Sequence, residues 1–142
     1  MEIKNTTTPQ HKHNFKFGKE EKLCSRKIFE LLVAKGENFF IHPFKVIYLK
    51  HELPIDGAPL QVAFVVPKRN FKKAHDRNFI KRHMREAYRH NKHKLFDQCV
   101  NQKQKMALLL IYAPKNLTNF YEVSQKIVLV LHRLIKVNGK HH

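Results

Sequence analysis

The sequence has no tryptophan, only two cysteines and only four glycines among its 142 residues. The two cysteines, Cys24 and Cys99, form neither a CxxC pair nor a disulfide framework, which is typical of reduced thiols in the cytoplasm. The glycines form no P-loop and no GxGxxG motif, which argues against a cradle for a free nucleotide. The chain therefore has to be stabilised by an ordinary hydrophobic core.

Long hydrophobic runs are also missing. The longest, MALLLIYA (106–113) and IVLVL (127–131), are far too short to span a bilayer. The opening MEIKNTTTPQHKHN lacks the apolar core of a signal peptide, so we expect a cytoplasmic protein that is not exported and has no membrane partner. A hydrophobic content of 42% with 11 phenylalanines nevertheless argues against intrinsic disorder.

Acidic residues are scarce, because 11 Asp and Glu stand against 28 Lys and Arg, for a formal net charge of +17. Such a field favours polyanions, of which nucleic acid is the usual one. Phosphoryl transfer by protein alone needs a metal held by clustered carboxylates, or an acid–base pair, and the acids here are scattered. The pairs His90/His93 and His11/His13 lack the further ligands of a tetrahedral zinc site. We expect no catalytic residue, metal or cofactor on the protein side chains.

Hydrophobic periodicity predicts one α/β sandwich domain with a four-stranded sheet, in the order α-β-β-β-α-β-α. Residues 1–15 are expected to form a flexible basic arm, 16–137 the domain, and 138–142 a disordered tail. Helices are predicted at about 19–35, 75–94 and 119–137, with Gly36 at the C-terminal cap of the first. Strands are predicted at 38–41, 44–50, 60–67 and 106–114; the last is apolar throughout and should be buried on both faces. Residues 96–105 resemble a polar connection.

The helix predicted from His75 to Lys94 concentrates positive charge on one side. With a rotation of about 100° per residue, its cations and one amide fall within an arc of roughly 140°. Ile80, Met84 and Ala87 fall outside this arc, with Tyr88 at the border. A solvated helix face normally mixes charges of both signs, so this arc favours phosphate binding. The residues of the arc are Arg77, Asn78, Lys81, Arg82, Arg85 and Arg89.

The loop before this helix extends the cationic surface. It supplies Lys68, Arg69, Lys72 and Lys73, so that residues 67–94 carry 11 of the 28 Lys and Arg. In a loop that leads into a helix N-terminus, backbone amides would add further dipoles for phosphate.

Residues 77–86, RNFIKRHMRE, closely resemble the RN-x-x-KR-x-x-R signature of the bacterial ribonuclease P protein subunit. Residues 17–36 are similar to the first helix of that family, and PFKVIYL, QVAFVVPKR and YAP stand at its strand positions. The resemblance covers about residues 15–136 and implies the predicted fold, with a left-handed crossover through the basic helix.

The resemblance also implies a function. Proteins of this family bind a catalytic RNA and help it to remove the 5′ leader of precursor tRNA, and the RNA–protein holoenzyme requires Mg²⁺. One protein would bind one RNA subunit, with the signature residues at the contact. A cleft between the first helix and the sheet would hold the leader, with Phe29 and Phe44 at its aromatic positions. Val33 and Ile47 stand where many relatives have further aromatics.

Two alternatives stay open on the residues alone. Aromatic side chains in strands usually pack in a core, so spacing by itself does not separate packing from base stacking for Phe39, Phe40 and Phe44. Charge and periodicity likewise fit a ribosomal or other structural RNA-binding protein without a role in cleavage. The spacing of the signature, with matching elements on both sides, favours the ribonuclease P subunit.

Overall fold

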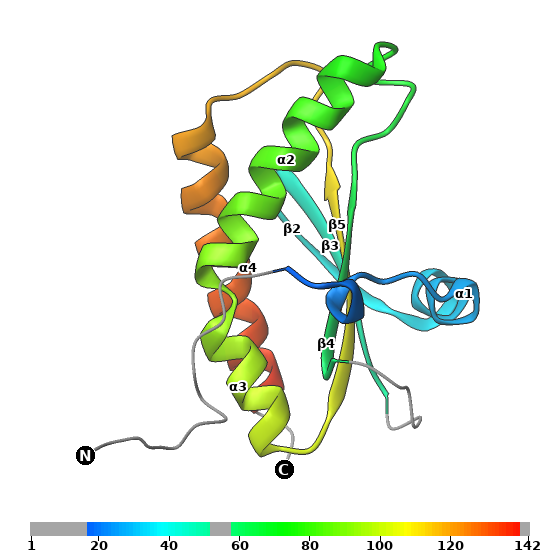
Figure 1. Ribbon diagram of the computed structural model, residues 1–142, viewed down its shortest axis with the longest axis vertical. Coiled ribbons are helices and arrows are strands. Elements are labelled where there is room, and N and C mark those ends of the chain that lie inside the picture. Colours follow the sequence, from blue (N-terminus) through cyan, green and yellow to red (C-terminus); the bar gives the residue numbers. More distant parts are fainter. Residues whose placement is uncertain (1–16, 52–57, 140–142) are drawn as a thin grey trace.

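The computed structural model describes residues 17–51 and 58–139 (Figure 1). Four strands form one sheet that is flanked by helices on both sides. The elements are the 3₁₀ turn η2 (Lys19–Glu21), α1 (Arg26–Lys35), β2 (Glu37–Ile41), β3 (Phe44–His51), β4 (Leu60–Val65), α2 (Ala74–Asn91), α3 (His93–Asn101), β5 (Lys105–Tyr112) and α4 (Phe120–Gly139).

The sheet has the order β2-β3-β5-β4. β2 pairs antiparallel with β3, β3 pairs antiparallel with β5, and β5 pairs parallel with β4. Because parallel neighbours need a crossover, the chain leaves β4, passes through α2 and α3 and returns along β5. The four-stranded α/β fold is thus confirmed, while the left hand of the crossover stays a prediction from the resemblance.

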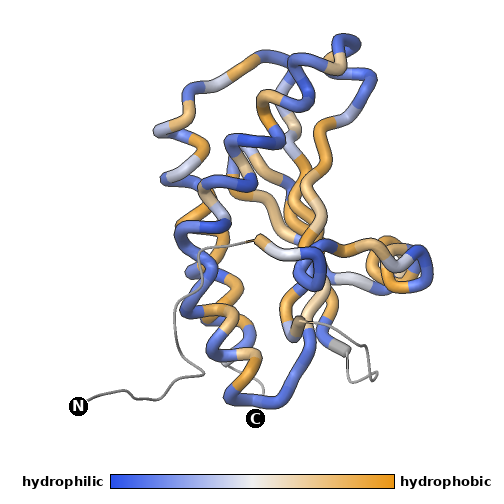
Figure 2. Tube along the Cα trace, in the orientation of Figure 1, coloured by the Kyte–Doolittle hydropathy of each residue, from blue (hydrophilic) through white to orange (hydrophobic). Residues whose placement is uncertain are grey.

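Strand β5 lies in the interior, as its continuous apolar sequence predicts. Alternate side chains point to opposite faces of a strand, so β5 contributes to two cores. Met106 and Leu108 join the large core beneath α2 and α4, whereas Ala107 and Leu109 pack with Ile28 of α1. Figure 2 shows hydrophobic colour along the strands, while α2 is mainly hydrophilic. The sheet therefore separates α1 from α2 and α4 (Figure 1).

The first helix is shorter than predicted. Lys19–Glu21 forms a separate 3₁₀ turn, and α1 begins at Arg26 because the Ser25 hydroxyl caps it by accepting a hydrogen bond from the Ile28 amide. Cys24 precedes the helix and is exposed, so its expected place inside the first helix is wrong. Gly36 ends α1 as predicted, and a β-carbon there would come within 2.8 Å of Ile47 Cγ2. The lack of a side chain lets the end of α1 lie close to β3 while the chain turns into β2.

The long basic helix is divided. α2 ends at Asn91 and α3 follows from His93, so the prediction of a polar connection at 96–105 is wrong over most of its length. Leu95 and Cys99, four residues apart, are the buried side of α3. The break falls at Lys92, whose buried ammonium pairs with the Glu21 carboxylate at 2.5 Å. This ion pair fixes the junction of the two helices against the 3₁₀ turn.

The last helix is longer than predicted, since α4 continues to Gly139. Asn138 is buried and donates a hydrogen bond from Nδ2 to Gln98 Oε1, so the predicted tail is wrong for its first two residues. The rest of that tail and the predicted arm at 1–15 lie outside the described residues. Within the described ranges, no helix has both the length and the apolar content needed to cross a membrane.

Candidate nucleic-acid interface

Helix α2 has the two sides predicted from its sequence. Ile80, Met84, Ala87 and Tyr88 are buried, and they pack in the large core. Tyr88, at the predicted border, is fully buried and closes a ring cluster with Phe17 and Phe64. The other residues of the cationic arc lie elsewhere on the helix: Asn78 and Arg82 are exposed, and Lys81, Arg85 and Arg89 are partly exposed.

Arg77 has a structural role in addition to its charge. Its Nη1 atom donates hydrogen bonds to the carbonyl oxygens of Phe71 and Lys72, at 2.7 and 3.0 Å. Arg77 lies at the end of the cationic arc nearest the core, where its guanidinium reaches the preceding loop. It therefore holds that loop against the first turn of α2.

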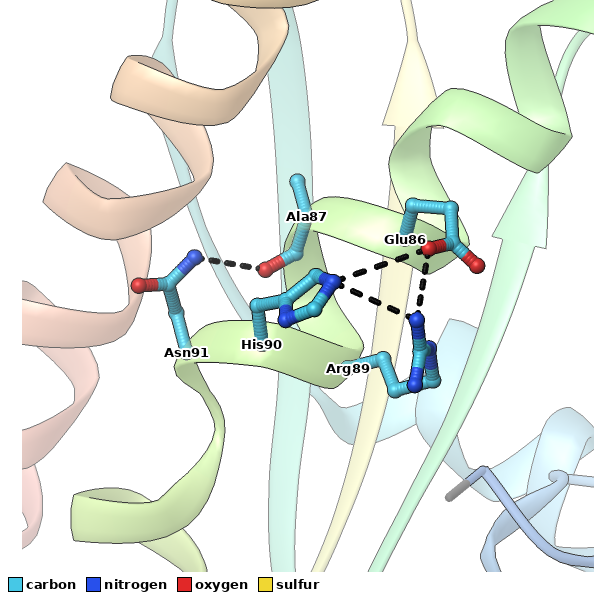
Figure 3. Close-up of polar contacts among 5 residues, drawn as sticks. All are labelled: Glu86, Ala87, Arg89, His90 and Asn91. Carbon is cyan, nitrogen blue, oxygen red and sulfur yellow. Dashed lines mark hydrogen bonds and ion pairs between the residues drawn. The ribbon is translucent and has the colours of Figure 1, made fainter. Parts of the chain in front are cut away.

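Arg89 is also engaged within the protein. Its Nη2 atom donates to Glu86 Oε1 at 2.7 Å, and His90 lies beside both (Figure 3). The hydrogen bond from Arg89 lowers the pKa of the Glu86 carboxyl. Glu86 thus pairs with Arg89 and lies close to His90, at the C-terminal end of the helix.

Three signature cations are available for an external anion. Among the described residues, Lys81, Arg82 and Arg85 form no ion pair with an acidic side chain. Lys68 and Arg69 are exposed in the loop after β4. The Asn70 amide nitrogen donates to the Ala113 carbonyl at 3.1 Å, which ties this loop to the end of β5. The structure therefore presents the cations on a fixed helix and a fixed loop.

A second candidate surface lies on the α1 side of the sheet. Phe29 and Val33 of α1 are 38% and 59% exposed, and Ile47 of β3 is half-buried against the same small core. These three residues are brought to one side of the sheet, as the resemblance implies.

The prediction for Phe44 is wrong. Phe44 is fully buried in the large core, where its ring packs against Tyr112 at 6.2 Å between centroids. Phe44, Val46 and Tyr48 point towards α2 and α4, while the alternate residue Ile47 points towards α1. Phe44 therefore cannot stack on a base that lies beside α1.

Phe40 is an aromatic residue whose role the sequence alone leaves open. It pairs with Lys45 across β2 and β3, two residues along the strands from the pair Asn38–Ile47, and therefore on the same face as that pair. Phe40 is 55% exposed and Lys45 is also exposed, so an aromatic ring and a cation stand side by side at the sheet edge. The sequence signal for an exposed Phe40 is the alternation of side chains along the strand NFFI (38–41), which places Phe39 and Phe40 on opposite faces of the sheet.

Among the described residues, no three His, Cys, Asp or Glu side chains converge to hold a metal ion. Burial raises the pKa of the Cys99 thiol to about 11, which removes it as a thiolate nucleophile at neutral pH. The exposed functional groups are cations and aromatic rings, which contact phosphates and bases. Fold and surface together define an α/β protein whose helix α2 presents a cationic side suited to a polyanion.

The family model described as Ribonuclease P matches residues 17–134, and the chain belongs to this family. The ribonuclease P protein component of Chlorobium phaeobacteroides is 30% identical over 125 residues, which cover 82% of this chain and 86% of the relative. That of Porphyromonas gingivalis is 28% identical over 123 residues, covering 84% and 87%.

Two solved structures have the same fold. The RNase P protein from Thermotoga maritima superposes with a TM-score of 0.57 at 24% identity, over 80% of this chain and 96% of that protein. The Staphylococcus aureus RNase P protein gives a TM-score of 0.59 at 19% identity, over 80% and 94%.

Proposed function

We propose that this chain is the protein subunit of a ribonuclease P, which assists endonucleolytic removal of the 5′ leader from precursor tRNA. The family match carries the proposal, since it spans the fold and includes the whole basic signature on α2. The curated relatives are named ribonuclease P protein components, and nothing in the comparisons favours the ribosomal alternative.

The RNA subunit would bind the outer side of α2. Asn78, Lys81, Arg82 and Arg85 are the proposed direct contacts, because they avoid the core and the last three have no acidic partner among the described side chains. Lys68 and Arg69 would extend the contact along the loop. Arg77 and Arg89 would act differently, since each is already hydrogen-bonded within the protein. Arg77 would chiefly hold the loop in the conformation that binds RNA.

The single-stranded leader would lie on the α1 side of the sheet. Phe29, Val33 and Ile47 are retained in this proposal, and Phe40 takes the aromatic role that the sequence assigned to Phe44. Base–aromatic stacking contributes about 1–3 kcal/mol per base and tolerates different bases, so two exposed rings suit a leader of variable sequence. Lys45 next to Phe40 would meet a phosphate.

The chemistry would take place on the RNA. The described side chains do not fit a protein-held metal ion, so the Mg²⁺ ions of the holoenzyme would be held by RNA phosphates. The protein would contribute binding and positioning, as a monomer in a 1:1 complex with the RNA in the cytoplasm. Its cationic groups would help most when magnesium is scarce.

A comparison of substrates tests this proposal. The RNA–protein complex should bind precursor tRNA more tightly than mature tRNA, because only the precursor has a leader to occupy the α1 side. The RNA subunit alone should show a smaller difference. Equal affinities for the two tRNAs, with and without the protein, would contradict the proposed leader contact.

A further inference from the structure

A cavity of about 310 Å³ lies where the end of α2 and the start of α3 meet α4. Its size is at the lower end of the range for small-molecule sites. Val128, Leu131 and Ile135 of α4 form an apolar floor, and Asn91, Lys94 and His132 form a polar rim. This cavity is on the opposite side of the sheet from α1, and therefore away from the proposed leader surface (Figure 1).

The cavity follows from the break in the basic helix. Lys92 directs its ammonium into the protein, where it pairs with Glu21, and both α2 and α3 pack on α4. The chain bends at this buried residue, so that His90 and Asn91 precede the bend and His93 and Lys94 follow it, all four lining the cavity.

The titratable side chains that line the cavity are all basic. Its titratable lining groups are three histidines and Lys94, and no carboxylate is among the lining residues. The neighbouring hollow along α4 adds Arg133 and Lys136. Glu86, the acid close to His90, is hydrogen-bonded to Arg89. An anionic occupant fits this rim, and an apolar floor beneath it fits a flat ring.

Asn91 supplies a defined hydrogen-bonding group. Its Nδ2 atom donates to the Ala87 carbonyl at 2.7 Å, and because a carbonyl only accepts, this bond fixes the orientation of the amide. Figure 3 shows the Oδ1 atom directed away from α2, towards α4. The cavity thus contains an oriented acceptor, which suits the N–H groups on the edge of a nucleobase.

We propose that this cavity binds one unpaired nucleotide of an RNA. The base would lie on Val128, Leu131 and Ile135, with one of its N–H groups donating to Asn91 Oδ1. The phosphate would lie between Lys94 and His132. Unpaired bases are the parts of RNA that proteins bind in this way, through an apolar surface, an edge contact and a nearby cation. The site is a second RNA contact, separate from the leader surface and from the outer side of α2.

Three substitutions test the three parts of the site. Val128→Phe fills the floor, Asn91→Leu removes the acceptor, and Lys94→Ala removes the cation. Lys103→Asn is the matched control, because it removes one charge at the other end of α3 and asparagine tolerates the positive φ of 54° there. Affinity is measured for the RNA subunit alone, and for precursor tRNA added to the preformed RNA–protein complex. Thermal melting of each variant shows whether it is folded.

Each cavity variant should weaken one of these two affinities by about tenfold, near the lower end of base-stacking effects because the floor is aliphatic. If the affinity for the RNA subunit falls, that RNA provides the nucleotide. If the affinity for precursor tRNA falls, the substrate provides it. Lys94→Ala should also reduce the salt slope by about one unit, whereas Val128→Phe should leave it unchanged. Control and cavity variants that lose affinity equally would overturn the proposal, since only general charge would matter.

If the folded cavity variants keep the wild-type affinity for both the RNA subunit and precursor tRNA, the proposed nucleotide site is also overturned. A protein partner would then be the remaining candidate for the cavity. If Val128→Phe does not fold, Asn91→Leu and Lys94→Ala decide the question. Failure of the wild-type protein to bind the RNA subunit would instead overturn the proposed function as a whole.

Discussion

Two phenylalanines of one hairpin should respond in opposite ways to truncation. Phe44 is fully buried against Tyr112, and Phe40 is 55% exposed on the other face of the sheet. Replacing a buried phenylalanine by alanine costs about 3–5 kcal/mol, from lost burial and from the cavity left behind. In a protein of this size, Phe44→Ala should lower the melting temperature by roughly 10–15 °C. Phe40→Ala should change stability by no more than about 0.5 kcal/mol.

Function should show the reverse pattern. Phe40→Ala removes one stacking platform worth about 1–3 kcal/mol, so the preference of the RNA–protein complex for precursor over mature tRNA should fall by roughly 5- to 150-fold. Below its melting temperature, Phe44→Ala should keep that preference.

The assay is competition binding of the two tRNAs, with thermal melting of the free protein as the measure of folding. Phe40→Tyr, which retains the ring, is the control and should behave as the wild type. A Phe44→Ala protein that is fully stable but has lost the preference would refute the assignment of faces.

Three further predictions concern α2. Arg82→Glu should weaken binding to the RNA subunit with little change in melting temperature, whereas Met84→Asp should unfold the protein by burying an unpaired charge; the opposite outcome would mean that the helix faces the other way. Arg77→Ala should lower the free energy of unfolding by about 1–3 kcal/mol, because the carbonyl groups of Phe71 and Lys72 lose a charged donor. Urea unfolding of this variant would show the loss, and Arg82→Ala, measured in the same way, is the control. If the protein neutralises about 5–8 phosphates of the RNA subunit, a plot of log affinity against log salt concentration should have a slope of roughly −0.7 to −0.9 for each phosphate. An affinity that does not depend on salt would contradict phosphate binding.

The strands and the two-sided basic helix could be predicted from the sequence because their hydrophobic patterns are strong. The start of α1 was misplaced although Ser25, a favoured capping residue, stands directly before the helix. Helix α3 is not predicted from the sequence because its apolar residues, Leu95, Phe96, Cys99 and Val100, recur over a helix of only 9 residues. Hydrophobic periodicity is a strong signal over windows of about 11–18 residues.

The face of Phe44 could not be derived from alternation. In β3 the residues on both faces are mostly apolar, since Phe44, Val46 and Tyr48 face one core and Ile47 and Leu49 the other. A strand with two apolar faces has no pattern that distinguishes them. The hydrogen-bonding of Arg77 was equally inaccessible, because it depends on the path of the preceding loop.

The most direct test of the central claim is cleavage of precursor tRNA by the cognate RNA subunit, with and without this protein, at low magnesium concentration. We predict 5′-end cleavage that depends strongly on the protein when magnesium is scarce and less so when it is abundant. We also predict no cleavage by the protein without RNA at any magnesium concentration. Cleavage by the RNA that is indifferent to the protein, or site-specific cleavage by the protein alone that is lost when a histidine or an acid is replaced, would contradict the account.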